Sequence, residues 1–312
     1  MSLQEQNSYP FIRRFLIYQK ERFPFLGHGL LVASFSFSAI SYSRICRGAE
    51  GFVSLSTFLV GIVTTITLFF LVRVFDEFKD AEDDAKHRGH LPVPRGLISF
   101  KELAMAGAVA VAIQLALNIY FFPKMLILYG AVIAYLCLMG KEFFVGEWLK
   151  KRQLWYVVSH MLIIPLIDMY ASGLDWLLAG VEAPKGLIFF FLVSFMNGIV
   201  LEIGRKIRVP EKEEFNTYST MMGAEKATKL WILTLALTFG FSLLASWFAG
   251  YGLTGFLILL FFFALCSFPA FLFLYRQSER HSKLIEYASA LWTIGMYLTL
   301  GGVPMISQLL HL

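Results

Sequence analysis

Six acidic side chains lie within nine residues directly after a long apolar segment, among them Asp76, Glu77, Asp80, Asp83 and Asp84. If the apolar segment continues as an α-helix, Asp76, Asp80 and Asp84 fall along one stripe of it, over roughly 12 Å. Hard divalent cations take such oxygen ligands, and Mg²⁺ usually combines one or two carboxylates with phosphate oxygens and water. The acidic run therefore predicts a metal-bridged diphosphate site at a membrane surface. A solvated helix end with ion pairs four residues apart is the alternative.

Basic side chains that could bind phosphate oxygens lie in the same loop and in two others. Arg88 follows the acidic run, Lys141 follows a later apolar segment, and Arg205 and Lys206 follow another. Glu202 ends that last segment much as Asp76 ends its own. Glu202 is either a metal ligand or the ion-pair partner of Lys206 one turn later.

Three polar side chains lie inside apolar segments: His160, Asp168 and Asn197. An ionisable group at membrane depth usually faces the protein interior or a watery cavity. His160 and Asp168 are eight residues apart, so they share roughly one face of a helix. These three residues are candidates for a second-substrate pocket or a base. A buried structural hydrogen bond is the alternative for each.

The elements that must position these residues are membrane-spanning helices. Hydrophobic residues make up 57% of the 312 residues and charged residues 16%, with a mean hydropathy of +0.65. This composition excludes an ordinary soluble domain and predicts an all-α polytopic membrane protein with one transmembrane domain over residues 1–312. Nine stretches approach or exceed the roughly 20 apolar residues that span a bilayer. They are residues 24–43, 52–75, 101–121, 122–140, 153–171, 185–201, 229–249, 252–275 and 284–302.

Charge predicts the orientation of these spans. A cytoplasmic N-terminus leaves only four of the 27 Lys and Arg residues outside, which satisfies the positive-inside rule. The C-terminus then lies on the opposite side, and the acidic run faces the cytoplasm. Basic and aromatic residues alternate within residues 1–23, as in an interfacial amphipathic segment or a polar tail. Because the basic residues fall between apolar segments and form no single face, a nucleic-acid partner is not expected despite the net charge of +5.

Charged loops follow both the second and the sixth apolar stretch, which indicates two four-helix units and a ninth helix. This arrangement resembles the UbiA superfamily of intramembrane prenyltransferases, whose members carry two Asp-rich motifs after the second and sixth of nine helices. Asp76-Glu77-x-x-Asp80-x-x-x-Asp84 matches the spacing of the family's first motif, Asn-Asp-x-x-Asp-x-x-x-Asp. Arg88 and the segment 92–96, Pro-Val-Pro-Arg-Gly, resemble the tail of that motif.

The second motif departs from the family pattern. Glu202-x-x-x-Lys206 stands where many members have Asp-x-x-x-Asp. The second acid therefore comes from Glu211, Glu213 or Glu214, or it is absent.

The resemblance implies a UbiA-like bundle of about nine helices with a central cavity open toward the cytoplasmic side. It also implies ionisation of an isoprenyl diphosphate and transfer of the prenyl group to a hydrophobic acceptor, for which an aromatic ring is one candidate. A UbiA-type class I terpene cyclase acting on farnesyl or geranylgeranyl diphosphate is the first alternative, and a transporter or lipid-binding protein is the second. The expected location is a bacterial cell membrane, among membrane lipids. The implied Mg²⁺ ligands are Asp76, Glu77, Asp80, Asp84 and Glu202, of which all but Glu77 are also expected to be catalytic, and the implied diphosphate contacts are Arg88, Lys141, Arg205 and Lys206.

Overall fold

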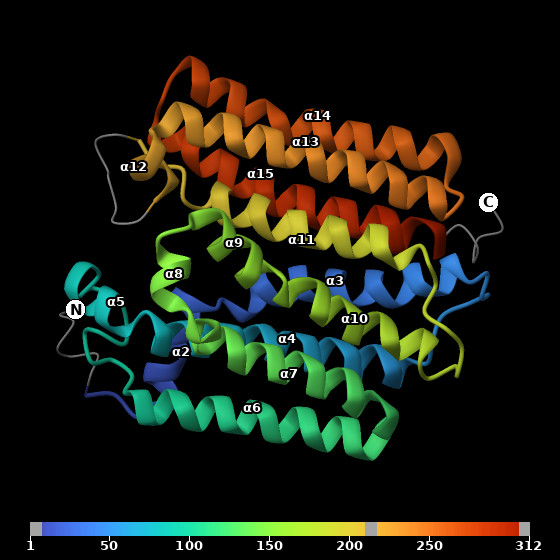
Figure 1. The fold of residues 1–312 in the computed structure, drawn as a ribbon, viewed down its shortest axis with the longest axis horizontal. Helices are drawn as coiled ribbons and strands as arrows, with labels where there is room; N and C mark the ends of the chain where they lie inside the picture. Colours follow the sequence, from blue (N-terminus) through green and yellow to red (C-terminus); the bar gives the residue numbers. More distant parts are fainter. Residues whose placement is uncertain (1–7, 210–216, 306–312) are drawn as a thin grey trace. The chain divides into compact units, whose positions relative to one another are not determined.

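A computed structural model describes residues 8–209 and 217–305, and within these ranges every regular element is a helix. The contacts divide the chain into two compact units. The first unit comprises Met1–Ala33 and Leu55–Tyr156, and the second comprises Ser34–Ser54 and Val157–Leu312. The all-helical prediction is confirmed. Each unit is described in turn (Figure 1).

In the first unit, the long helix α4 packs against α6 and α7 (Figure 1). The contact is close because Gly140 on α7 leaves room for the ring of Phe75, which a Cβ at that position would overlap. Helix α6 begins with a capping box in which Ser99 and Glu102 exchange hydrogen bonds with each other's backbone. The helices are α2 (Phe11–Arg22), the first half of α3 (Phe25–Cys46), α4 (Leu55–Lys79), α5 (Ala81–His87), α6 (Phe100–Phe121), α7 (Leu126–Gly140) and α8 (Gly146–Lys150). Two 3₁₀ turns, Pro123–Met125 and Glu142–Phe144, flank α7.

Helix α2 packs through one face against the rest of the first unit. Arg14 forms an ion pair with Glu102 and donates a 2.8 Å hydrogen bond to the carbonyl of Leu97. The opposite face exposes Ile12 and Leu16. A helix with this division of faces is what an interfacial segment requires. Its contact with lipid stays a prediction.

In the second unit, α11 packs against α13 and α15, and α13 and α14 form a hairpin (Figure 1). The π-helical turn at the end of α15 approaches α3 so closely that a Cβ at Gly301 would overlap the backbone of Ser38. Helices of this unit, besides the second half of α3, are α9 (Gln153–Met161, from residue 157 onward), α10 (Ile163–Trp176), α11 (Leu187–Gly204), α12 (Tyr218–Met222), α13 (Ala224–Phe248), α14 (Gly252–Tyr275) and α15 (Glu279–Tyr297). The π turn covers Leu298–Gly302.

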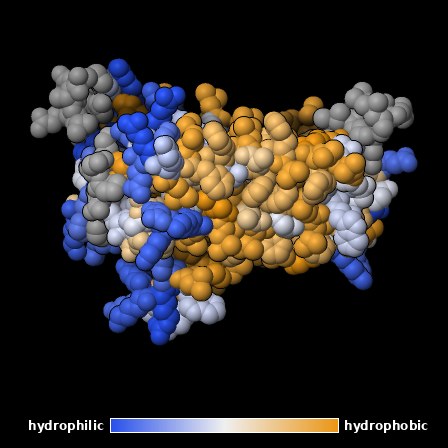
Figure 2. Space-filling model, turned by 90° about the horizontal axis from the view of Figure 1, so that it is seen from above, coloured by the Kyte–Doolittle hydropathy of each residue, from blue (hydrophilic) through white to orange (hydrophobic). Residues whose placement is uncertain are grey.

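Eight helical segments of the described ranges are long and apolar enough to cross a membrane, which agrees with the first eight predicted spans. Their exposed side chains are mostly hydrophobic, as the orange surface in Figure 2 shows. Helix α15 carries Glu279, Arg280, Lys283 and Glu286 in its first two turns, which keeps it outside this set. The count of nine spans and their orientation therefore stay predictions. The segments are Phe25–Cys46, Leu55–Lys79, Phe100–Phe121, Pro123–Gly140, Gln153–Trp176, Leu187–Gly204, Ala224–Phe248 and Gly252–Tyr275.

Two features differ from the pattern read in the sequence. The fifth span breaks at Leu162, because Pro165 has no N–H to donate to the carbonyl of Met161. The first span also belongs largely to the second unit, whereas the hydropathy pattern places it among the first four helices.

Buried Asp175 on α10 forms ion pairs with Arg44 at 3.1 Å and with Arg47 at 2.7 Å. These ion pairs hold the end of α3 against α10.

Candidate functional site

The acidic run lies where α4 ends and α5 begins, in the first unit. Helical backbone hydrogen bonds continue across the junction, from the Asp80 N–H to the Asp76 carbonyl at 2.8 Å and from the Asp84 N–H to the Asp80 carbonyl at 2.9 Å. The side chains of Asp76 and Asp80 are 28% and 38% exposed, but that of Asp84 is only 3% exposed. The junction thus keeps helical hydrogen bonds, although Asp80 itself has a φ of −90° and a ψ of 7°, and two of the three carboxylates are partly exposed.

Asp76 and Asp80 share one cation. The Lys79 ammonium lies 3.2 Å from the Asp76 carboxylate and 3.8 Å from that of Asp80. It also lies over the ring of Tyr156, 5.4 Å from the ring centre. Desolvation raises the pKa of the Asp80 carboxyl above its ordinary value, and the charge of Lys79 opposes that shift.

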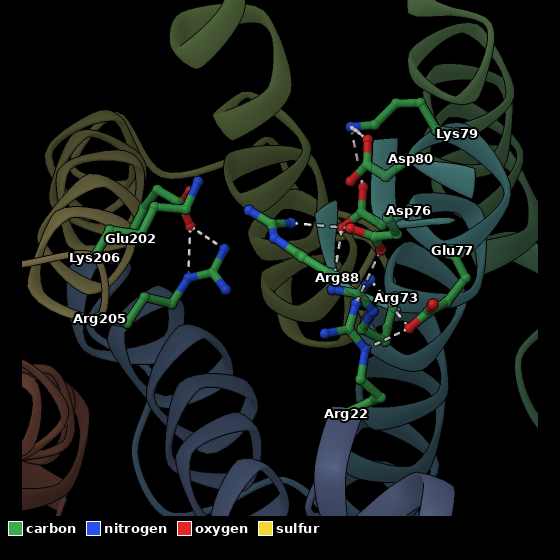
Figure 3. A network of polar contacts seen from close by, with 11 residues as sticks. Arg22, Arg73, Asp76, Glu77, Lys79, Asp80, Arg88, Glu202, Arg205 and Lys206 are labelled. Atoms are coloured by element: carbon green, nitrogen blue, oxygen red, sulfur yellow. Dashed lines mark hydrogen bonds and ion pairs between the residues drawn. The ribbon is translucent and has the colours of Figure 1, made fainter. Parts of the chain in front are cut away.

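Glu77 and Asp84 are buried and are paired with arginines. Figure 3 shows Glu77 beside Arg22 and Arg73. The Arg22 guanidinium at the end of α2 donates to Glu77 at 2.6 Å and lies 3.8 Å from Asp84. Arg73 also pairs with Glu77, at 3.1 Å, and Arg88 pairs with Asp84 at 3.0 Å. Burial, with the charge of Glu77 adding to it, raises the pKa of the neighbouring phenol of Tyr18.

Charges in this network balance. Four carboxylates, those of Asp76, Glu77, Asp80 and Asp84, meet four cations, those of Arg22, Arg73, Lys79 and Arg88. In the described ranges no three His, Cys, Asp or Glu side chains converge as a ready-made metal cage. Two half-exposed carboxylates one helical turn apart nevertheless fit Mg²⁺, which takes its remaining ligands from phosphate and water.

The second charged loop begins at the end of α11, in the second unit. Glu202 accepts a 2.7 Å hydrogen bond from Arg205 Nε through one carboxylate oxygen, and its other oxygen lies 2.7 Å from Lys206 Nζ. The backbone N–H of Arg208 donates to the Ser219 hydroxyl at 2.8 Å, which fixes the start of the loop. The alternative ligands Glu211, Glu213 and Glu214 lie outside the described residues.

Lys141 is exposed at the end of α7, where it could reach a phosphate. The 3₁₀ turn that follows is unusual, because Glu142, Phe143 and Phe144 all have positive φ angles, of 49°, 54° and 59°. Left-handed backbone costs a residue with a side chain roughly 1–2 kcal/mol. Such strain is often found at functional sites.

The polar residues inside the spans of the second unit form one buried group. Asp168 on α10 is fully buried, and neither of its carboxylate oxygens has a hydrogen bond within the described residues. Tyr297 on α15 donates to the Ser194 hydroxyl at 2.9 Å and interacts with both Asp168 and Asn197. Asn197 accepts a 3.1 Å hydrogen bond from the indole of Trp292. The structure therefore places Asp168 and Asn197 in one group.

His160 is buried at the end of α9, on the other side of the helix break from Asp168. Its Nδ1 atom lies 3.3 Å from the hydroxyl of Ser159. The spacing of eight residues assumes a continuous helix. The backbone at Leu162 keeps helical angles, with φ of −62° and ψ of −16°, so the shared face of His160 and Asp168 stays a prediction.

The sequence interpretation missed three cations of the acidic network. Arg73 and Lys79 are within one turn of Asp76, and helical spacing could have assigned both as partners. Arg22 is 55 residues from Glu77, and no local pattern identifies that pairing.

Comparison with known proteins decides the family. The profile of the UbiA prenyltransferase family matches residues 34–301. The chain belongs to this family. It is therefore an integral, multi-pass membrane protein of the prenyltransferase type, and the predicted resemblance is confirmed.

Two solved structures share the fold of this UbiA family member. One is a structure of digeranylgeranylglyceryl phosphate synthase in membranes. It has a TM-score of 0.58 and 14% identity, and the match covers 97% of this chain and 100% of that chain. The other is an apo structure of a UbiA homolog from Aeropyrum pernix K1, with a TM-score of 0.61 and 13% identity over 90% of this chain and 98% of that chain. No curated protein matches the chain. At these identities the structures show the fold alone.

Proposed function

We propose that this UbiA family member ionises an isoprenyl diphosphate at the end of α4 and transfers the prenyl group to a hydrophobic acceptor. The observation that carries the proposal is the pair Asp76 and Asp80, two half-exposed carboxylates one turn apart at the end of a membrane span. Asp76 and Asp80 would hold Mg²⁺ there, and the bound ion would supply positive charge that stabilises the leaving diphosphate. The orientation of the spans predicts that this site faces the cytoplasm.

The cations around the carboxylates have a part in the same reaction. The allylic C–O bond breaks, and its electron pair leaves with the diphosphate. Lys79 and Arg88 lie beside the acidic run, where they can donate to phosphate oxygens as this negative charge grows. Lys141 is exposed at the end of α7 and is a further candidate. Fixed donors placed where charge develops lower the barrier for ionisation.

Capture of the allylic cation completes the transfer. A nucleophilic atom of the acceptor forms a bond to the cationic carbon, and the acceptor then loses a proton. The buried group of Asp168 and Asn197 is the candidate for contact with the acceptor, and a carboxylate such as Asp168 can take up its proton. If the substrate's own double bond captures the cation, the same ionisation gives a cyclic terpene.

The test uses the full chain in lipid nanodiscs with Mg²⁺ and, in turn, geranyl, farnesyl and geranylgeranyl diphosphate. Released diphosphate and the mass of the organic product are measured with and without an aromatic acceptor. We expect Asp76→Asn and Asp80→Asn to slow diphosphate release by about 100-fold or more. Asp83→Asn is the matched control, because Asp83 is an exposed acid of the same run, and it should retain the wild-type rate.

Three outcomes contradict parts of the proposal. A cyclic hydrocarbon or alcohol formed without an acceptor would replace the transferase by a terpene cyclase. Wild-type rates in both Asp76→Asn and Asp80→Asn would reject the metal site. Absence of diphosphate release from all three substrates would favour a transporter or lipid-binding protein.

A further inference from the structure

The loop after α11 has a cation where a second carboxylate would complete an acidic motif. We infer that this loop is itself a phosphate-binding site, formed by Arg205 and Lys206, and that Glu202 orients these two cations and does not ligate the metal of the reaction. The inference rests on the proposed function. In it, Glu202 is a positioning residue for the two cations, whereas the family resemblance assigns it to the metal.

Both carboxylate oxygens of Glu202 are engaged within its own loop. One accepts from Arg205 and the other contacts Lys206, three and four residues further along the chain. Only 15% of the Glu202 side chain is exposed. A metal bound to Glu202 would lie beside the two cations that this carboxylate already holds. Like charges at such distances repel strongly where water is scarce.

The two loops differ in charge although both begin where an apolar helix ends. From Asp76 to Arg88 the first loop has six carboxylates and three cations, and the carboxylates of Asp76 and Asp80 are partly exposed. From Glu202 to Arg208, the described part of the second loop has one carboxylate and three cations. The first arrangement can accept a metal that arrives with a phosphate group, whereas the second attracts the phosphate itself.

The end of α11 is held rigidly enough to present these cations. A Cβ at Gly204 would overlap the Ser289 hydroxyl, so α11 lies directly against α15 here. The Trp231 indole donates to the carbonyl of Val200 at 3.1 Å and to Ser289 at 3.0 Å. The Arg205 side chain is 54% exposed, so its planar guanidinium can donate hydrogen bonds to two phosphate oxygens while Glu202 fixes its orientation.

The experiment measures binding of metal and of diphosphate separately. The full chain in nanodiscs is titrated with Mn²⁺ at saturating inorganic pyrophosphate, and free Mn²⁺ is followed by its electron paramagnetic resonance signal. Pyrophosphate affinity is measured in parallel by calorimetry. We expect Glu202→Gln to bind as many Mn²⁺ ions per chain as the wild type, while Asp80→Asn binds fewer.

Pyrophosphate affinity should respond in the opposite way. Arg205→Gln and Lys206→Gln are each expected to bind pyrophosphate about tenfold more weakly, because each removes a charge-assisted hydrogen bond. Their Mn²⁺ number should be unchanged. Lys229→Gln is the matched control: Lys229 pairs with Glu225 at the same spacing of four residues, but both side chains are 63% exposed on α13. It should bind pyrophosphate as the wild type does.

Lys206→Asp tests whether the lysine at this position is what keeps metal away from the loop. This variant places two carboxylates four residues apart, at 202 and 206, and should add Mn²⁺ binding. Loss of Mn²⁺ in Glu202→Gln would overturn the inference while leaving the proposed function intact. If the wild type binds no Mn²⁺ with pyrophosphate, the metal site of the proposed function fails, and the inference fails with it.

Discussion

The guanidinium of Arg22 donates a 2.6 Å hydrogen bond to the carboxylate of Glu77, so the helix before the first span is fastened to the acidic run after the second. Glu77 is 1% exposed and also pairs with Arg73. Removing one partner of a buried ion pair costs about 3–5 kcal/mol when the other charge is left alone. Because Arg73 remains, the cost for Arg22→Gln should lie near the lower end of that range.

Arg22→Gln should therefore lower the thermal unfolding temperature in detergent, and Glu77→Gln should do the same. The double variant should be less destabilised than the sum of the two single effects. The reason is that both charges of the Arg22–Glu77 pair are removed together, so neither charge is left without the other. Lys20→Gln, which changes an exposed cation of the same helix, is the control and should unfold at the wild-type temperature. Strict additivity of the two effects would show that Arg22 and Glu77 are not coupled.

Two buried aspartates of α10 should respond differently to the same substitution. Asp168 and Asp175 are 0% and 2% exposed and lie seven residues apart. Asp175 holds Arg44, Arg47 and the Ser43 hydroxyl, at 2.7–3.1 Å, whereas the Asp168 oxygens have no hydrogen bond within the described residues. Asp175→Asn should thus destabilise the protein by about 3 kcal/mol or more, because it leaves two arginines without their carboxylate.

Asp168→Asn should leave the unfolding temperature unchanged or raise it, because the buried carboxyl group lies beside the Ser194 hydroxyl and has no ion pair within the described residues to offset the cost of its burial. The unfolding of both variants is measured in the same detergent, with the wild type as reference. A large loss of stability in Asp168→Asn would show that this carboxyl group has a structural partner. The proposed role in the reaction would then lose its support.

The activity of Asp168→Asn distinguishes the two steps of the reaction. We expect diphosphate binding and Mn²⁺ binding to match the wild type, because the acidic run is untouched. Transfer to the acceptor should fall by about 100-fold or more if Asp168 accepts the proton. The measurement is single-turnover formation of prenylated product beside release of diphosphate. Transfer at the wild-type rate would remove Asp168 from the reaction and leave the ionisation site standing.

Much of the molecule follows from short-range patterns in the sequence. The eight apolar segments, the family and the position of the acidic run at a helix end are confirmed. The helix stripe correctly relates Asp76 to Asp80, since backbone bonds set that spacing. Even the break at Leu162 has a local cause in Pro165. Such features depend on residues within about one or two turns of each other.

Burial within the acidic run could not be predicted in this way. Glu77 and Asp84 differ from Asp76 and Asp80 because Arg22, from a distant helix, lies over them. The spacing of the acids in the sequence does not indicate that Arg22 is their partner. Likewise, Asp168 and Asp175 are both acids inside one helix, and only the approach of α3 decides which of them is paired. The metal and diphosphate roles of these residues stay predictions.

The left-handed turn after α7 offers a test of stored backbone strain. Phe144 has a φ of 59° and is 78% exposed, so its side chain contributes little packing within the protein. Glycine adopts this conformation freely, whereas any other residue pays roughly 1 kcal/mol or more. Phe144→Gly should therefore be more stable than Phe144→Ala by about 1 kcal/mol, measured as a higher unfolding temperature in the same detergent. Comparison with alanine removes the effect of losing the ring, because neither variant keeps it. Equal stabilities would mean that the turn is not left-handed at Phe144, and the strain beside Lys141 would then have no part in the site.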